Sequence, residues 1–195
     1  ANPSVGFKIS TSGDAIDVDC VQNEAGAKAT SPIVTTTSTV SRNGDSLTYQ
    51  TTGNIDAALG TLFCEYSVYE ETVASPRVII GLSTSAATVN ALLLHTTGVA
   101  TSSLSSGDGT TLFANTGLGS AVNTKRKAAV SWGTGRSLTA GGLAPQAGAF
   151  SGTLPSTAIA PGAYTNGTFQ LNGYIGPVAI YNYQMTDAEL QAITS

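Results

Sequence analysis

The sequence predicts an all-β fold in which two antiparallel sheets pack face to face, with one short helix at the C-terminus. Three observations predict it. Apolar and polar residues alternate with a period of two along most of the chain. Turn-forming Gly, Asn, Asp and Pro residues separate the alternating segments. A helix-capping sequence stands close to the end of the chain.

The predicted strands are short and are spaced by roughly 8–12 residues, which is typical of a sandwich or barrel. They cover residues 5–9, 15–21, 33–40, 61–69, 77–82, 91–95, 127–132 and 174–181. Pairs such as Asn172-Gly173 and Gly141-Gly142 supply the positive-φ positions that tight turns need. Residues 140–166, rich in Gly, Ala, Pro and Ser, are predicted to form a long loop with one or two short strands.

The helix is predicted over residues 186–193. Thr186 and Glu189 match a capping box, in which the Thr side chain caps the N3 amide and the Glu side chain reaches back to the Thr amide. Met185, Leu190 and Ile193 then form one apolar stripe. We therefore expect this helix to fold against the sandwich.

Length and composition limit the classes of function. A chain of 195 residues can bury one sizeable core and is short for two ordinary domains. Charged residues make up 10% of it, against about 25% in an average soluble domain, and Ser, Thr, Gly, Ala and Asn take their place. The basic run 125–127 is too small for a nucleic-acid face. No apolar run approaches the roughly 18 residues of a membrane-spanning helix.

The two cysteines, Cys20 and Cys64, are predicted to lie on apolar strand faces. Ile16 and Val18 share the face of Cys20, and Leu62 shares the face of Cys64. We expect two buried free thiols, with a disulfide as the alternative. The single histidine, His95, and the absence of a Cys-x-x-Cys pair exclude the usual zinc spacings.

No pattern of acids or nucleophiles specifies a reaction. Asp17 and Asp19 have the spacing of two carboxylates on one strand face, but no Glu-x-Asp-x-x-Glu sequence of glycanases is present. Asp14 and the turn around Asp108 could supply some oxygens to calcium, but are better explained as solvated acids. No Gly-x-Ser-x-Gly elbow accompanies His95. We expect no catalytic site, no metal and no cofactor.

Three segments resemble a known family. They are residues 37–45 with 60–66, residues 125–138 leading to Gly141-Gly142, and Leu171-Asn172-Gly173-Tyr174-Ile175 running into Thr186-Asp187-Ala188-Glu189-Leu190. Together they resemble the laminin-G-like, concanavalin A-like modules of tailed-phage virion proteins, particularly tail and fibre proteins, over residues 32–195. Residues 1–31 lie outside the resemblance, as a strand pair of this family or a lead-in from a longer virion protein.

The resemblance implies a single domain over residues 1–195 with a concanavalin-like jelly-roll sandwich of two antiparallel sheets. It implies a place on the surface of a phage particle, contact with host-surface glycan and with other virion proteins, and a homotrimer in the intact particle. It also implies reduced thiols, because phage proteins assemble in the host cytosol. For the isolated chain we expect a monomer or weak oligomer, because no heptads or long apolar stripe demand a partner.

The aromatic residues are the candidate ligand contacts. Trp132 and Arg136 flank the turn 133–135, where a ring face and a guanidinium could hold a sugar. Tyr181 and Tyr183 share one strand face. Core packing of Trp132 is the alternative. Tyr49, Tyr69 and Tyr164 are further candidates, each better explained as a packing residue. Three functions remain open, namely a non-catalytic glycan-binding module, a structural or decoration module without sugar binding, and a glycan-degrading enzyme.

Overall fold

The computed structural model describes residues 8, 10–17, 47–69, 76–82, 91–96, 103–110, 112–116, 123–154, 158–167 and 169–195. The chain divides into two units, Ala1–Asn43 and Gly44–Ser195. In the first unit the described stretch 10–17 is exposed and contains a turn at Thr11–Asp14, where Gly13 has a φ of +98°. Ile16 is 52% exposed and lies outside any strand, so its predicted place on a buried strand face is wrong. The predicted strands 5–9 and 33–40, Val18, Asp19 and Cys20 lie largely or wholly outside the described residues.

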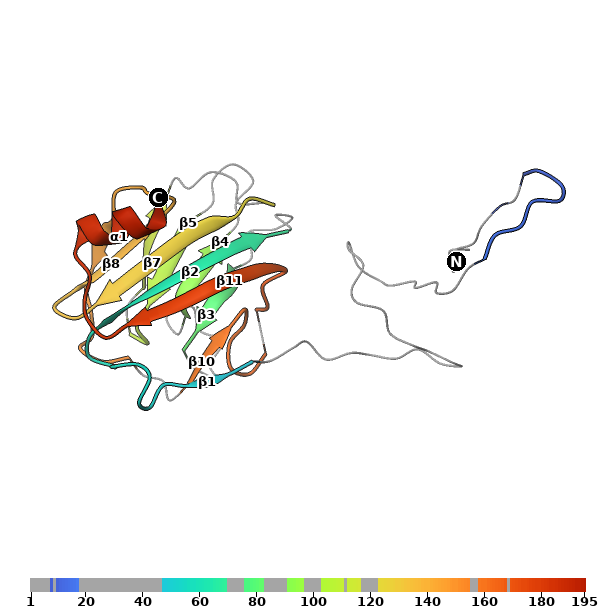
Figure 1. Ribbon diagram of the computed structural model, residues 1–195. Coiled ribbons are helices and arrows are strands. Elements are labelled where there is room, and N and C mark those ends of the chain that lie inside the picture. The colour runs from blue at the N-terminus through green and yellow to red at the C-terminus, as the bar shows by residue number, and fades with distance from the viewer. Residues whose placement is uncertain are drawn as a thin grey trace. The chain divides into compact units, whose positions relative to one another are not determined.

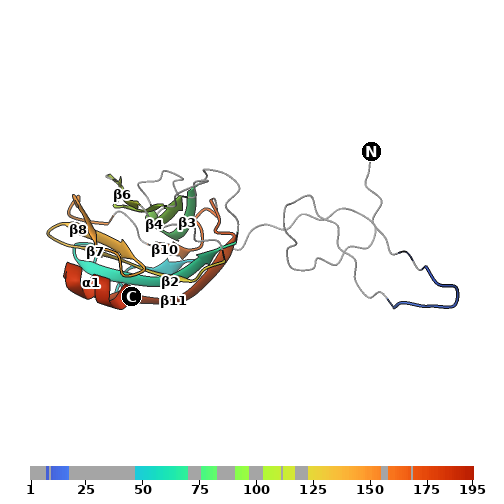
Figure 2. The ribbon, with the colours of Figure 1, turned by 90° about the horizontal axis from the view of Figure 1, so that it is seen from above.

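The second unit is a two-layer β-sandwich with one helix (Figures 1 and 2). In the described part of the chain, one sheet has six strands in the order β1-β10-β3-β4-β5-β6 and the other has five in the order β11-β2-β7-β8-β9. Every described strand pair is antiparallel. The elements are β1 Tyr49–Gln50, β2 Gly60–Val68, β3 Pro76–Gly81, β4 Ala91–Thr96, β5 Ser103–Gly107, β6 Leu112–Thr116, β7 Arg126–Trp132, β8 Arg136–Ala140, β9 Gln146–Gly148, β10 Ala158–Pro161, β11 Gly173–Tyr181 and α1 Asp187–Thr194. The predicted fold class is confirmed.

The core lies between the two sheets because alternate residues of each strand point inward. On β2 the inward set is Leu62, Cys64, Tyr66 and Val68, all 0% exposed. From the opposite sheet come Ile80, Leu92, Leu93 and Leu104, equally buried. Leu92 and Leu93 are consecutive, and here the pairing of β4 with β3 departs from regular register. The alternation read from the sequence therefore identified the buried face of β2 correctly, including Cys64.

Four strands, β1, β5, β6 and β8, lie outside the predicted strand ranges, and the composition of β5 shows why it was missed. β5 has a single large apolar residue, Leu104, among serines and a glycine, and its last two residues were interpreted as a turn. It forms because β4 and β6 pair with it on both sides, Leu94 opposite Ser105 and Ser106 opposite Phe113. In the segment 140–166, by contrast, the two short strands β9 and β10 confirm the prediction.

The helix α1 packs on the outer face of the five-stranded sheet (Figure 2). Met185 and Leu190 are buried there against Ala129 of β7, with Ile193 partly buried beside them. Both halves of the predicted capping box form between Thr186 and Glu189. No helix in the described residues has the length and apolar character of a membrane span.

Candidate functional site

Trp132, the last residue of β7, is a core residue. Its side chain is 0% exposed, and its ring N–H donates a hydrogen bond to the carbonyl oxygen of Asp56 at 3.0 Å. The ring lies over Gly60 on the neighbouring strand, where a Cβ would come within 2.5 Å of the ring atom Cζ2. A ring held in this way has no free face for a sugar, so the structure favours the packing alternative for Trp132.

Arg136, the first residue of β8, is also buried, with 1% of the residue exposed. Its guanidinium lies 3.6 Å from the Asp108 carboxylate, and it donates hydrogen bonds to the carbonyl oxygens of Ala149 (2.8 Å) and Ser106 (3.1 Å). Burial lowers the pKa of Arg136, and the Asp108 charge opposes that shift. Because protein groups occupy this guanidinium inside the sandwich, the expected contact of Arg136 with a ligand does not fit the structure.

Asp108 corrects a second expectation, that the acid of this turn is solvated. It is 1% exposed and accepts hydrogen bonds from the backbone amides of Ser151 (2.8 Å) and Thr110 (3.0 Å). The turn after β5 folds inward because Arg136 and these amides replace water around the carboxylate. Within the described residues, no three His, Cys, Asp or Glu side chains gather as a metal site would require.

Tyr181 and Tyr183 are brought together at the end of β11. Their ring centroids are 6.0 Å apart, with an angle of 68° between the planes. Tyr183 is 49% exposed, whereas Tyr181 is partly buried against the cluster under α1. Of the four predicted ligand residues, these two alone reach the surface, and Tyr183 is the better placed for contact.

An apolar groove runs between the edge strands of the two sheets. We call it the edge groove; its volume is about 780 Å³. Its walls come from β1 and β10 on one side and from β11 on the other, and include Leu47, Tyr49, Ile159 and Val178. Tyr49 is 54% exposed there. Tyr49 is therefore less buried than a packing residue was expected to be, because β1 is only a two-residue strand at the edge of its sheet.

A second hollow has a different chemistry. We call it the Arg77 hollow; its volume is about 500 Å³. Its described lining residues combine one cation, one aromatic ring and two amides, and they are Arg77, Gly167, Phe169, Gln170, Leu171 and Asn172. A larger fraction of its lining surface is polar than in the edge groove.

The backbone between β10 and β11 builds the Arg77 hollow. After β10 the chain continues beside β3, where Gly162 N–H donates to the Ile79 carbonyl (2.8 Å) and Val78 N–H donates to the Phe169 carbonyl (3.1 Å). A tight turn at Gly167, with φ +77°, reverses the chain. Asn172 then accepts a hydrogen bond from Tyr69 N–H at 2.8 Å, just before β11 begins. Backbone hydrogen bonds of the described residues thus hold the walls of the hollow to β3 and to Tyr69.

Phe169 has a positive backbone φ, which is unusual for an aromatic residue. Its φ is +54°, a left-handed conformation that costs a bulky residue of order 1–3 kcal/mol. The ring is 38% exposed and packs edge to face on Tyr164, with centroids 5.8 Å apart. Tyr164 is itself buried, as predicted for a packing residue, and burial raises its pKa. Strain of this kind persists where the surrounding structure fixes it, and it is a common feature of binding sites.

Solved structures with the same architecture support the fold. The heptameric SAP-like pentraxin of Limulus polyphemus has a TM-score of 0.55 and 11% identity, over 71% of this chain and 70% of the pentraxin. The CBM40 domain of the Ruminococcus gnavus IT-sialidase, solved with α2,3-sialyllactose, has a TM-score of 0.52 and 15% identity, over 79% and 97%. Domain 4 of the Geobacillus stearothermophilus arabinanase AbnA, solved with arabinotriose, has a TM-score of 0.51 and 11% identity, over 73% and 69%.

The domain is a concanavalin-like jelly roll. Identities of this size establish the fold alone. No family model matches the sequence, and no curated protein matches it either.

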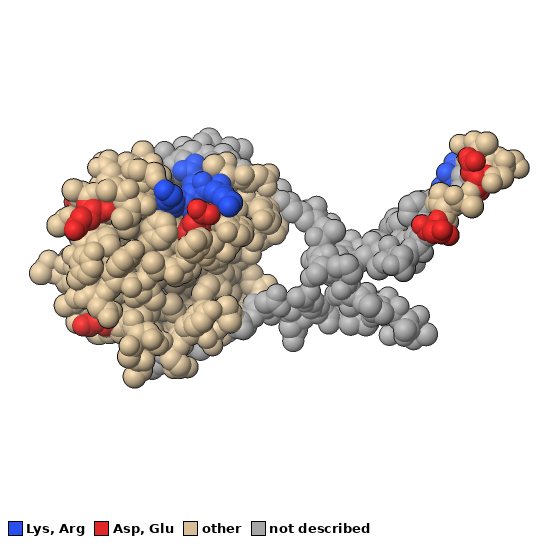
Figure 3. All heavy atoms as spheres, viewed as in Figure 1, with Lys and Arg blue, Asp and Glu red and all other residues tan. Residues whose placement is uncertain are grey.

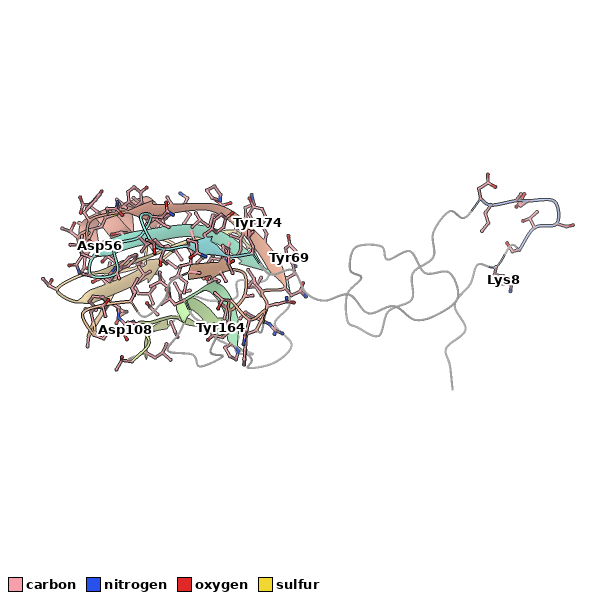
Figure 4. All side chains as sticks on the ribbon, turned by 90° about the horizontal axis from the view of Figure 1, so that it is seen from below. Lys8, Asp56, Tyr69, Asp108, Tyr164 and Tyr174 are labelled. Atoms are coloured by element: carbon pink, nitrogen blue, oxygen red, sulfur yellow. The ribbon has the colours of Figure 1, made fainter. Side chains whose placement is uncertain are left out.

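The buried Arg136–Asp108 pair and the Arg77 hollow lie at different ends of the jelly roll. Figure 4 places Asp56 and Asp108 toward one end and Tyr69 and Tyr174 toward the other. The buried Arg136–Asp108 pair therefore lies at the end away from Tyr69, whereas the Arg77 hollow lies at the Tyr69 end through its Asn172 contact. The predicted ligand residue Arg136 accordingly lies at the end away from the Arg77 hollow.

Lys125 and Lys127 of the basic run 125–127 contact neighbouring residues of the same domain. Figure 3 shows Lys and Arg side chains gathered in one group beside an acidic side chain. Lys125 lies 3.5 Å from the Glu65 carboxylate and 4.9 Å from the centre of the Tyr174 ring, and Lys127 donates to the Ser195 carbonyl.

The sequence did not single out Arg77 or Phe169 as ligand contacts. One local signal was present, the turn-forming Asn166-Gly167 pair just before an aromatic residue. No signal placed this turn beside Arg77, because β3 and the chain before β11 are far apart in the sequence. The hollow exists only once β10 has paired with β3.

Proposed function

We propose that the jelly roll is a non-catalytic recognition module that binds host-surface glycan, and that the Arg77 hollow is its binding site. The observation that carries the proposal is the combination in one hollow of an exposed Phe169 ring, two amide side chains and a guanidinium. Sugars are bound by stacking on aromatic faces and by planar hydrogen-bonding groups around them. The 500 Å³ volume is within the usual range of small-molecule sites.

The structural neighbours support the proposal at the level of the fold. The CBM40 domain was solved with sialyllactose and the AbnA domain with arabinotriose, so this architecture is used to hold oligosaccharides. One fold hosts many functions, however, so the side chains of the hollow carry the proposal.

The non-catalytic part of the proposal rests on charge. No Asp or Glu is among the described residues that line the Arg77 hollow or the edge groove. Glycoside hydrolysis commonly needs two carboxyl groups beside the scissile bond. Neither hollow supplies that pair from its described residues.

The wider setting is proposed on the sequence resemblance. The turn, strand and capping-box order of residues 171–190 resembles phage tail and fibre modules, and the neutral, hydroxyl-rich composition suits a virion surface. We place the module on the surface of a tail or fibre protein, in contact with other virion proteins and as part of a homotrimer in the particle.

The test is binding of the fluorescently labelled chain to a glycan array and to intact host cells. Phe169→Asn removes the ring and keeps a residue that tolerates positive φ, so it should abolish binding without unfolding the domain. Tyr183→Ala is the matched aromatic control, because Tyr183 is exposed outside the hollow, and it should bind as the wild type does. A folded wild-type chain that binds no glycan and no cells would overturn the proposal.

One observation favours the structural module as a second candidate. The edge groove exposes Leu47 and Tyr49, each 54% exposed, together with Val178 at 37%. Apolar surface of this kind suits packing against another protein of the particle. Light scattering at micromolar concentration tests it. The isolated chain is expected to be a monomer or weak oligomer, whereas a trimer that persists on dilution would favour the assembly role.

A further inference from the structure

We propose that the Arg77 hollow selects anionic sugars, and that the Arg77 guanidinium binds the carboxylate or sulfate group of the ligand. This inference rests on the proposed glycan-binding function and deepens it. It concerns the class of sugar.

The first observation is the position and the surroundings of Arg77. It lies on β3 one residue after the strand begins and is partly buried. Among the described residues, its guanidinium has neither a hydrogen-bond nor an ion-pair partner. A guanidinium in this position can pair with an anion on a ligand through charge-assisted hydrogen bonds.

Arg136 provides the internal comparison. This arginine is fully buried, and it has an aspartate and two carbonyl oxygens around it. The fold thus supplies partners where an arginine is structural. At Arg77 the described lining offers a ring and two amides but no acid. An anionic ligand that enters the open hollow would therefore meet a guanidinium that no described acid neutralises.

The geometry around Arg77 favours an anion carried on a sugar over a free ion. Phe169 lines the same hollow and is kept 38% exposed at the expense of a positive φ. An aromatic face binds the C–H side of a sugar ring, and a planar guanidinium binds carboxylate or sulfate through two parallel N–H bonds. A free phosphate or sulfate would use Arg77 and gain nothing from Phe169.

The experiment compares three ligands that share one lactose core, namely lactose, 3′-sialyllactose and 3′-sulfolactose, within an array of acidic and neutral glycans. The acidic members are expected to bind at least about tenfold more tightly than their neutral counterparts, which is the usual scale of a charge-assisted hydrogen bond. The tighter of the two acidic ligands, 3′-sialyllactose or 3′-sulfolactose, shows whether the site prefers a carboxylate or a sulfate group. Inorganic sulfate alone is the probe for a free ion and should not bind measurably.

Two variants assign the effect to Arg77. Arg77→Gln should weaken the binding of acidic glycans about 10- to 100-fold, and by more than it weakens the binding of neutral ones, whereas Arg77→Lys should retain part of the preference. Lys125→Gln is the control of equal charge change, since Lys125 lies outside the hollow and is largely exposed. Matching unfolding midpoints in urea show that the variants are folded.

The outcomes separate the two levels of the proposal. Neutral and acidic glycans that bind equally, with Arg77→Gln unchanged, overturn the anionic class and leave glycan binding in place. Equal loss in Arg77→Gln and Lys125→Gln also overturns it, because the effect is then one of net charge. Binding of inorganic sulfate as tight as that of the acidic sugars overturns the role of Phe169. No binding to any glycan overturns the proposed function itself.

Discussion

Trp132 keeps its place in the core because the residue facing it across the strands has no side chain. Gly60 pairs with Trp132 in the β2–β7 ladder, and the indole ring occupies the space where a Cβ would stand. The ring is buried and its N–H is bonded to Asp56, so it cannot move aside freely. One glycine thus decides that a potential ligand platform is a core residue.

We expect Gly60→Ala to lower the free energy of unfolding by about 1–3 kcal/mol, the usual cost of overpacking a core. Urea unfolding followed by Trp132 fluorescence measures it. Gly135→Ala is the matched control, because a Cβ there has only one ordinary contact, 3.6 Å from the Gly148 oxygen, and it should change stability by less than about 1 kcal/mol. Equal midpoints for wild type and Gly60→Ala would show that the ring is mobile.

Cys64 is a free, buried thiol, and burial together with the Glu65 charge raises its pKa to about 12. Thiolate is the reactive form. In a Cys20→Ser variant, Cys64 should therefore resist a disulfide reagent such as DTNB at pH 8 and react fully once urea unfolds the chain. Fast labelling of the native protein would contradict this. For the wild-type chain kept from air, we expect the mass of two reduced thiols.

At the scale of elements, α1 depends on contacts at its first turn and on one buried face. The Thr186 hydroxyl accepts from Glu189 N–H at 3.4 Å, and the Glu189 carboxylate accepts from Thr186 N–H at 2.8 Å. Leu190 is fully buried against the five-stranded sheet. Capping fixes where the helix starts, and Leu190 fixes which face it buries.

Thr186→Ala should lower the free energy of unfolding by about 0.5–2 kcal/mol, because the N3 amide loses its acceptor. The midpoint of urea unfolding measures it, and Thr186→Ser, which keeps the hydroxyl, should lie close to wild type. A midpoint that Thr186→Ala leaves unchanged would mean that the helix is not part of the cooperative unit.

The same turn predicts a pH effect. Hydrogen bonds from Thr186 lower the pKa of Glu189 below its ordinary value of 4.5. A lowered folded-state pKa adds stability that is present above 4.5 and is lost as the pH falls through the folded value. The difference in urea midpoint between wild type and Glu189→Gln should therefore be largest near neutral pH and shrink on acidification. A difference independent of pH would show that the charge is not involved.

For the whole molecule, the buried Arg136–Asp108 pair joins the two layers. Arg136 begins β8 in the five-stranded sheet, and Asp108 directly follows β5 in the six-stranded sheet. Both side chains are 0% exposed. The pair fixes the sheets at the end of the sandwich away from the Arg77 hollow.

Asp108→Asn should lower the free energy of unfolding by about 3–5 kcal/mol, because it leaves Arg136 buried without a counter-charge. The double variant Asp108→Asn with Arg136→Met removes both charges and should lose less, which a double-mutant cycle in urea would measure. Additive losses would show that the two side chains do not stabilise the fold as a pair.

Local sequence patterns predicted the elements that form from the properties of their own residues. The alternation in β2 predicted that strand and its buried face, residues 127–132 were predicted as the strand that is β7, and the capping box placed the helix at 186–193 against 187–194 in the structure. Such patterns succeed because they depend on neighbours within one turn or one strand. β5, nearly all Ser and Gly, was missed because it becomes a strand only between β4 and β6.

The site was decided by the tertiary structure. In sequence, Trp132 and Arg136 flank a glycine-rich turn and resemble surface residues, yet Gly60, Asp56, Asp108 and Ala149 hold them inside. Arg77 and Phe169 carry no pattern, and only the pairing of β10 with β3 brings them to one hollow. Burial and proximity of side chains depend on long-range packing, and no period of two or 3.6 residues encodes which distant strands become neighbours.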